Sequence, residues 1–192
     1  MNSKSDFWED YKYIILAILF GIIVTIYSYD GFGISNHIEH LPPILRNLDD
    51  SYLINDFFTN ASVEGIARQY YALFISKLSG SEENLILLYL LLTFLTNISI
   101  SLSTFYFTRY LFMNSSRSGI FASAMVLSLS TLSLAGDSSF LHTTYLNPSN
   151  IAVAFILWAC YFVARGNLLL GITLSGISSI IHPLLGLEMG TL

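Results

Sequence analysis

The stretch Leu85–Thr108 reads LILLYLLLTFLTNISISLSTFYFT and contains 24 residues without a single charge. About 20 consecutive apolar residues in a helix are enough to cross the hydrocarbon core of a bilayer. A second uncharged stretch, the 17 residues Tyr13–Tyr29, precedes it and reads YIILAILFGIIVTIYSY. These two stretches predict an all-α membrane protein, and the rest of the chain is interpreted around them.

Three more apolar segments follow in the second half of the chain. They are Gly119–Ala135, Tyr145–Ala164 and Leu168–Leu187. Each approaches the length of one bilayer crossing, and small and hydroxyl residues recur in several of the segments, as is typical of helices that pack inside membranes. We therefore predict a polytopic transmembrane helix bundle of about five spans that forms a single membrane domain over residues 1–192.

The overall composition supports this class and excludes others. Hydrophobic residues make up 54% of the chain and charged residues 11%, with a mean hydropathy of +0.62, whereas soluble domains carry about 25% charged residues. The net charge of −5 and the lack of any Lys or Arg run argue against a nucleic-acid partner. The single cysteine, Cys160, excludes a disulfide framework and a cysteine-based metal site.

The few cations predict the orientation of the bundle. Short cytoplasmic loops of membrane proteins carry an excess of Lys and Arg. Threading five spans with the N-terminus in the cytoplasm places all the cations of the short loops inside, namely Lys4, Lys12, Arg109, Arg117 and Arg165. We therefore predict a protein of the bacterial inner (plasma) membrane, surrounded by the lipid bilayer. Its N-terminus is expected in the cytoplasm and its long first loop on the outer side.

The long outer loop, residues 30–84, contains most of the ionisable side chains, with eight acids against three bases. Within it, Asn36–Leu48 suits a short helix on the membrane surface, with Pro43 in the first turn. Ser62–Leu78 places apolar residues near helical spacing and predicts a second interfacial helix. Asp49–Tyr52 and Asn55–Phe58 are predicted to be turns.

Asp30 and Glu39 are the candidate catalytic residues of this loop. Asp30 stands where the first span ends, so the end of the helix fixes its position relative to the membrane. A carboxylate there can act as general base on a substrate hydroxyl, or hold a cation that neutralises a phosphate leaving group. The alternative is that each is an ordinary interfacial acid.

His37, Glu39 and His40 also invite a metal hypothesis. Histidine and carboxylate are ordinary ligands of divalent ions, so a site made from these residues and Asp30 is one candidate. The pattern H-x-E-H lacks the i, i+4 histidine spacing of zinc proteases, which makes the motif unspecific. Two other interpretations stay open: the histidines bind substrate without a metal, or they hydrogen-bond to lipid headgroups or loop backbone.

Three further residues are candidates for substrate binding. Arg46 is the one cation in the first half of the loop and can receive a phosphate or pair with a neighbouring carboxylate. Asp56 is a candidate ligand, although acids in such loops more often form turns and helix caps. His182 precedes Pro183 inside the fifth apolar segment, where proline is expected to break the helix and an ionisable residue at membrane depth suggests function.

The stretches NHIEHLPPILRNLDDSYLINDFF, from Asn36, and HPLLGLEMG, from His182, resemble an uncharacterised family of bacterial multi-pass membrane proteins. The layout is similar to the N-terminal part of GT-C-type glycosyltransferases. That resemblance implies a cytoplasmic N-terminus, two surface helices in a large outer loop, and a lipid-linked sugar as donor. It also implies an acidic catalytic or metal-holding residue just after the first span, a place that Asp30 matches.

This chain differs from the GT-C pattern in one respect, and the resemblance also has an implication for the length of the protein. Many GT-C enzymes have adjacent acids after the first span, whereas Asp30 stands alone and the next acid is Glu39. GT-C enzymes typically have more than five spans, so we expect this chain to be the N-terminal portion of a longer protein.

Three functions are consistent with these patterns. The first is a GT-C-like glycosyltransferase that moves a hexosyl group from a polyprenyl-phosphate carrier on the outer face. The second is a transporter or channel, a class that uses broken helices at membrane depth, as at His182 and Pro183. The third is a non-catalytic assembly protein whose outer loop binds a partner.

Overall fold

The computed structural model describes residues 3–34, 37–63, 69–128 and 145–185, and all the regular elements in these ranges are α-helices. This confirms the predicted all-α class. The longest elements are α1 (Ser3–Ser28), α5 (Leu85–Leu111), α6 (Ser116–Ser128), α7 (Pro148–Ala164) and α8 (Leu168–Ile181).

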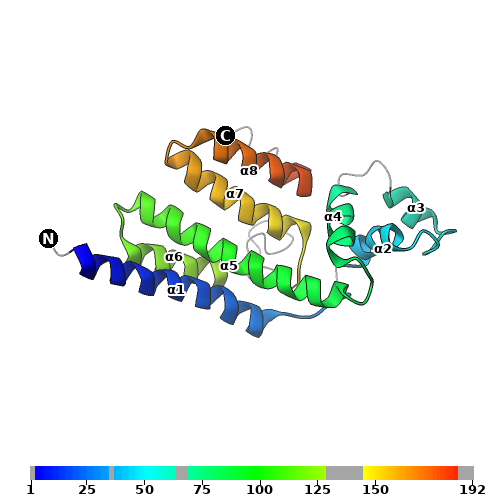
Figure 1. Ribbon diagram of the computed structural model, residues 1–192, viewed down its shortest axis with the longest axis horizontal. Helices are drawn as coiled ribbons and strands as arrows, with labels where there is room; N and C mark the ends of the chain where they lie inside the picture. Colours follow the sequence, from blue (N-terminus) through cyan, green and yellow to red (C-terminus); the bar gives the residue numbers. More distant parts are fainter. Residues whose placement is uncertain (1–2, 35–36, 64–68, 129–144, 186–192) are drawn as a thin grey trace.

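The long helices run back and forth along one axis (Figure 1). Helix α5 is central, because it packs against α1 and α6 on one side and against α7 on the other, while α8 covers α7. The N-terminus lies at one end of this bundle (Figure 1), and we call the opposite end, where α1 finishes and α5 begins, the loop end. Successive long helices alternate in direction along this axis (Figure 1).

Two helices are long and apolar enough to cross a membrane: Asp10–Ser28 within α1, and α5. Helices α7 and α8 are apolar but shorter, with 17 and 14 residues. Helix α6 has 13 residues, of which the ten from Gly119 to Ser128 belong to the expected third span; residues 129–135 of that span lie outside the described part of the chain. The described residues thus contain two candidate spans, fewer than the five that the sequence predicts.

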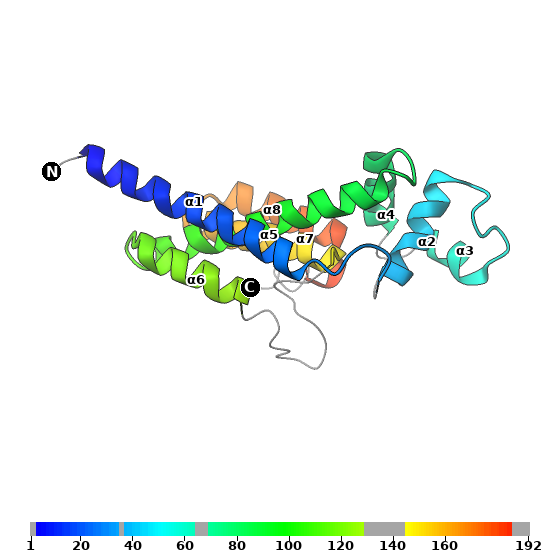
Figure 2. The same ribbon diagram turned by 90° about the horizontal axis from the view of Figure 1, so that it is seen from below.

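Three short helices pack together at the loop end in both views (Figures 1 and 2). They are α2 (His37–Leu48), α3 (Phe57–Val63) and α4 (Gln69–Ser79), and α4 stands between α2 and the bundle. Helix α2 coincides with the helix predicted over Asn36–Leu48. Helix α4 covers the second part of the helix predicted over Ser62–Leu78, whereas Ser62 and Val63 end α3, and residues 64–68 lie outside the described part of the chain.

Two details of this layer differ from the prediction. Residues from Phe57 onward form a helix rather than a turn, because Asp56 caps it: the Thr59 amide donates to Asp56 Oδ2 over 2.6 Å. Helix α2 begins at His37, so Pro43 lies in its second turn and not in its first, next to Pro42. Proline has no amide hydrogen, so neither residue can donate the usual helical bond to the carbonyl four positions earlier.

Side-chain hydroxyl and amide groups join the long helices where their backbones come close. Asn97 donates to Thr25 over 2.9 Å and Ser101 donates to the Ala17 carbonyl over 2.7 Å, which ties α5 to α1. Ser123 joins α6 to the Ser101 carbonyl, and Ser178 joins α8 to α7. These bonds between small residues are the usual means of helix association in an apolar environment.

Candidate functional site

The site candidates between α1 and α5 lie at the loop end of the molecule. Asp30 follows the last turn of α1 by two residues, and its side chain is exposed. In the last turns of α1, Thr25 donates to the Gly21 carbonyl and Ser28 donates to the Val24 carbonyl. Asp30 is therefore exposed in the non-helical segment that directly follows α1.

His37 is the central residue of this end of the molecule and is fully buried. The Gly33 amide donates to its Nδ1 over 3.0 Å, and its Nε2 lies 3.0 Å from the Leu146 carbonyl oxygen. Because an amide only donates and a carbonyl only accepts, these bonds select the neutral form with hydrogen on Nε2. Gly33 has a φ of +82°, a conformation that favours glycine.

An aromatic cage surrounds the His37 ring. The rings of Phe32, Tyr89 and Tyr145 lie 5.7, 4.8 and 5.4 Å from it, centre to centre. Burial lowers the pKa of His37 below its ordinary value, against a smaller raising effect of the bond to Leu146. Both ring nitrogens are engaged by backbone, so His37 would have to break one of these bonds to bind a substrate or a metal.

His40 lies one helical turn after His37 and is also buried. Its ring meets Tyr71 of α4 edge to face, with centroids 5.9 Å apart. The Tyr71 hydroxyl donates to the Tyr89 hydroxyl over 3.4 Å, and burial raises the pKa of Tyr71 well above its ordinary value. His40 thus contributes to the contact between α2 and α4.

Glu39 lies on the opposite side of α2. Ile38 and Glu39 are exposed, whereas His37 and His40 face inward. Helical geometry explains the split, because positions three apart share a face while adjacent positions do not. The candidate acid and the two candidate histidines are therefore neighbours in sequence but point in different directions.

The remaining loop candidates bond to nearby backbone. Arg46 Nη1 donates to the Tyr52 carbonyl over 2.7 Å. The amide and hydroxyl of Ser51 donate to Asp49, and these bonds lower the pKa of that carboxyl. Asp56 caps α3, and the bond from the Thr59 amide lowers its pKa in the same way. These bonds close the segment between α2 and α3.

His182 marks the end of α8. Its φ and ψ of −143° and 91° are extended, and its amide donates to the Ser178 carbonyl, as expected for a residue that precedes proline. Its Nδ1 accepts from the Leu185 amide over 3.4 Å. The predicted break at Pro183 is confirmed, and α8 ends beside α4 (Figure 1).

In the described residues, the candidate metal ligands do not come together to form a site. Across the described ranges, no group of three or more His, Cys, Asp or Glu side chains lies close enough to hold an ion. Asp30, Glu39, His37 and His40 are not brought together as the sequence suggested.

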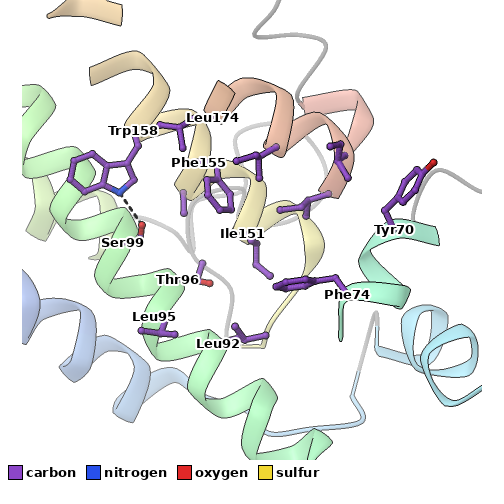
Figure 3. A pocket seen from close by; sticks show the side chains of 14 residues that line it. Tyr70, Phe74, Leu92, Leu95, Thr96, Ser99, Ile151, Phe155, Trp158 and Leu174 are labelled. Atoms are coloured by element: carbon purple, nitrogen blue, oxygen red, sulfur yellow. Dashed lines mark hydrogen bonds between the residues drawn. The ribbon is translucent and has the colours of Figure 1, made fainter. Parts of the chain in front are cut away.

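A groove that sequence reasoning missed opens between α4, α5, α7 and α8 (Figure 3), with a volume of about 560 Å³. At one end the Trp158 Nε1 donates to the Ser99 hydroxyl over 3.0 Å, and at the other stand Tyr70 and Phe74 of α4. None of the residues predicted to form the site lines it. Its lining consists of ordinary apolar helix residues, so the sequence carries no signal that distinguishes them from lipid-facing or core positions.

Comparison with known protein families, with curated proteins and with solved structures finds no match to this chain.

Proposed function

We propose that this chain is a multi-pass membrane protein with GT-C-like architecture that transfers a hexosyl group from a polyprenyl-phosphate carrier at the outer face of a bacterial plasma membrane. The observation that carries the proposal is the position of Asp30. It is exposed in the segment that joins the end of α1 to the start of α2.

In this mechanism Asp30 acts as general base. Its carboxylate takes the proton of an acceptor hydroxyl while the hydroxyl oxygen attacks the anomeric carbon of the donor sugar. The bond between that carbon and the carrier oxygen breaks, and the polyprenyl phosphate leaves with the electron pair. Glu39, exposed on α2, is the second candidate for the base.

The transfer step is tested with the full-length protein in proteoliposomes that contain a radiolabelled polyprenyl-phosphate hexose. Asp30→Asn is expected to reduce transfer by about 10²-fold or more, because a general base contributes at least that much. Asp50→Asn is the matched control, since Asp50 is another exposed acid of the same loop. Unchanged transfer in Asp30→Asn removes this residue from the mechanism.

The proposed orientation has a separate test. Cys160 is the one cysteine of the chain, so Cys160→Ala gives a cysteine-free background. In that background Asp50→Cys is expected to react with a membrane-impermeant maleimide in intact cells. Met113→Cys, at a position 96% exposed between α5 and α6, is expected to react only after the membrane is opened. Equal labelling of both positions in intact cells would contradict the orientation.

An assembly protein is the second candidate function, and exposed aromatic residues at the tip of the loop favour it. Phe57 and Phe58 are 76% and 79% exposed, and Leu53 and Ile54 beside them are also exposed. Apolar side chains gathered in this way are typical of protein interaction sites. In this case Phe58→Ser disrupts complex formation in the native membrane, while Asp30→Asn and Glu39→Gln are tolerated.

A transporter remains the third candidate, favoured by the break of α8 at His182 and Pro183. Uptake of solute into proteoliposomes that lack any lipid-linked donor would place the chain in this class.

A further inference from the structure

The groove between α4, α5, α7 and α8 is lined mostly by apolar side chains. Its lining includes no charged side chain. The polar side chains in it are the hydroxyl residues Tyr70, Thr96 and Ser99 and the indole of Trp158, and Ser99 and Trp158 bond to each other. A volume of about 560 Å³ falls within the range of about 300–1,000 Å³ typical of small-molecule sites.

The three long helices contribute equal lengths to the groove. The lining runs from Leu92 to Ser99 on α5, from Ile151 to Trp158 on α7, and from Leu174 to Ile181 on α8. Each run advances seven residues, or about 10 Å along a helix. One leaflet of a bilayer has about 15 Å of hydrocarbon, half of the full core. The groove therefore extends over about two thirds of the hydrocarbon thickness of a single leaflet.

The two ends of the groove differ in character. Tyr70 and Phe74 of α4 stand at the loop end, and Tyr70 is mostly exposed, so its hydroxyl is available at the mouth (Figure 3). Lys77 is also exposed and lies seven residues after Tyr70, which is the same face of α4. At the opposite end, Trp158 and Ser99 are partly buried and bond to each other. A ligand with a polar head and an apolar tail fits this polarity.

The side of the groove continues into exposed apolar surface. Leu95 of α5 and Ile180 of α8 line it and are 62% and 55% exposed. In a membrane such side chains face lipid, so a lipid chain can enter from the side without crossing water.

We propose that this groove binds the tail of a single-chain lipid of the outer leaflet, with the head at the mouth beside Tyr70 and Lys77. A single groove accommodates one hydrocarbon chain, whereas a phospholipid has two hydrocarbon chains. The inference rests on the membrane location in the proposed function, and it deepens that function by naming the site of the lipid chain.

The test is native mass spectrometry of the full-length protein with polyprenyl phosphate as the probe and phosphatidylglycerol in a parallel arm. Leu174→Phe with Ile177→Phe fills the groove from α8. The control carries Leu168→Phe with Ile172→Phe, the same residue types on the exposed surface of the same helix and outside the groove. Retained polyprenyl phosphate is expected to fall about tenfold in the filled variant and to stay unchanged in the control.

Three outcomes overturn the inference: polyprenyl phosphate held equally by the filled variant, phosphatidylglycerol retained in its place, or a protein dimer that the filled variant dissociates. The proposed function fails separately. If the groove binds the lipid but no hexose is transferred, the lipid site is confirmed and the glycosyltransferase function is not. If hexose transfer proceeds at full rate in the filled variant, the glycosyltransferase function is confirmed and the groove is not its lipid site.

Discussion

The Nε2 atom of His37 donates a hydrogen bond to the carbonyl oxygen of Leu146, which lies 3.0 Å away and 109 positions further along the chain. Leu146 is buried just before α7 begins, and His37 is the first residue of α2. The bond therefore ties the segment between α1 and α5 to the start of α7. The Gly33 amide completes the arrangement from the other side of the ring.

Removing the His37 ring is expected to loosen this junction. His37→Ala leaves the Gly33 amide and the Leu146 carbonyl without their partner and opens a cavity among three aromatic rings. Loss of a buried ring and two bonds costs about 2–5 kcal/mol of unfolding free energy. Unfolding in mixed detergent micelles with increasing SDS measures it. Ile38→Ala, at a position 72% exposed, is the control and is expected to cost under about 0.5 kcal/mol.

The same histidine predicts a pH dependence of stability. Burial lowers the pKa of His37 in the folded protein, so the unfolded chain takes up a proton first as the pH falls. The free energy of unfolding is therefore expected to decrease as the pH falls below about 6.5, the ordinary histidine value. The protein with His37→Phe, which keeps an aromatic ring but cannot titrate, should lose this part of the slope. Identical slopes in both proteins between about pH 8 and pH 5 would show that His37 is not the cause.

Gly21 allows α1 and α5 to approach closely. A Cβ atom at this position would lie 2.7 Å from Ile98 Cα and 2.8 Å from Ile98 N, and these backbone atoms cannot move without shifting α5. Gly21→Ala is expected to destabilise the protein by about 1–3 kcal/mol, the usual cost of overpacking. Gly176→Ala on α8 is the matched control, because nothing lies within 4 Å of its added Cβ. That change should raise stability slightly, since alanine favours a helix by about 0.5–1 kcal/mol. Equal effects of the two changes in the SDS titration would mean that α1 and α5 are not in close contact.

An ion pair links three helices at the end opposite the loop layer. Arg109 Nη2 donates to Asp10 Oδ2 over 2.6 Å, and the Ser116 hydroxyl donates to Asp10 Oδ1 over 2.8 Å. Both charged side chains are partly exposed, so the coupling energy between them is expected to be about 0.5–1 kcal/mol. A double-mutant cycle with Asp10→Asn and Arg109→Gln measures it. Additive effects of the two changes would show that the pair contributes nothing to stability.

Some of the local structure follows from local sequence. The sequence predicts a helix over Asn36–Leu48, which the structure has over His37–Leu48, and a break at Pro183; both are local consequences of side-chain pattern and proline geometry. Helix α3 was missed because the acid that caps it, Asp56, stands in a segment that also suits a turn. The catalytic role of Asp30 and Glu39 stays a prediction, since the structure only presents both side chains at the surface.

By itself, the sequence determined the all-α class and the order of the long helices, because uncharged runs such as Leu85–Thr108 satisfy their backbone polar groups only as helices in an apolar environment. Tertiary structure decided which side chains meet. It buried His37 against Leu146, turned Glu39 away from both histidines, and formed the groove that ends at Trp158. Local pattern specifies one helix at a time, whereas these contacts join residues of different helices, and only the packing of the whole bundle sets their distances.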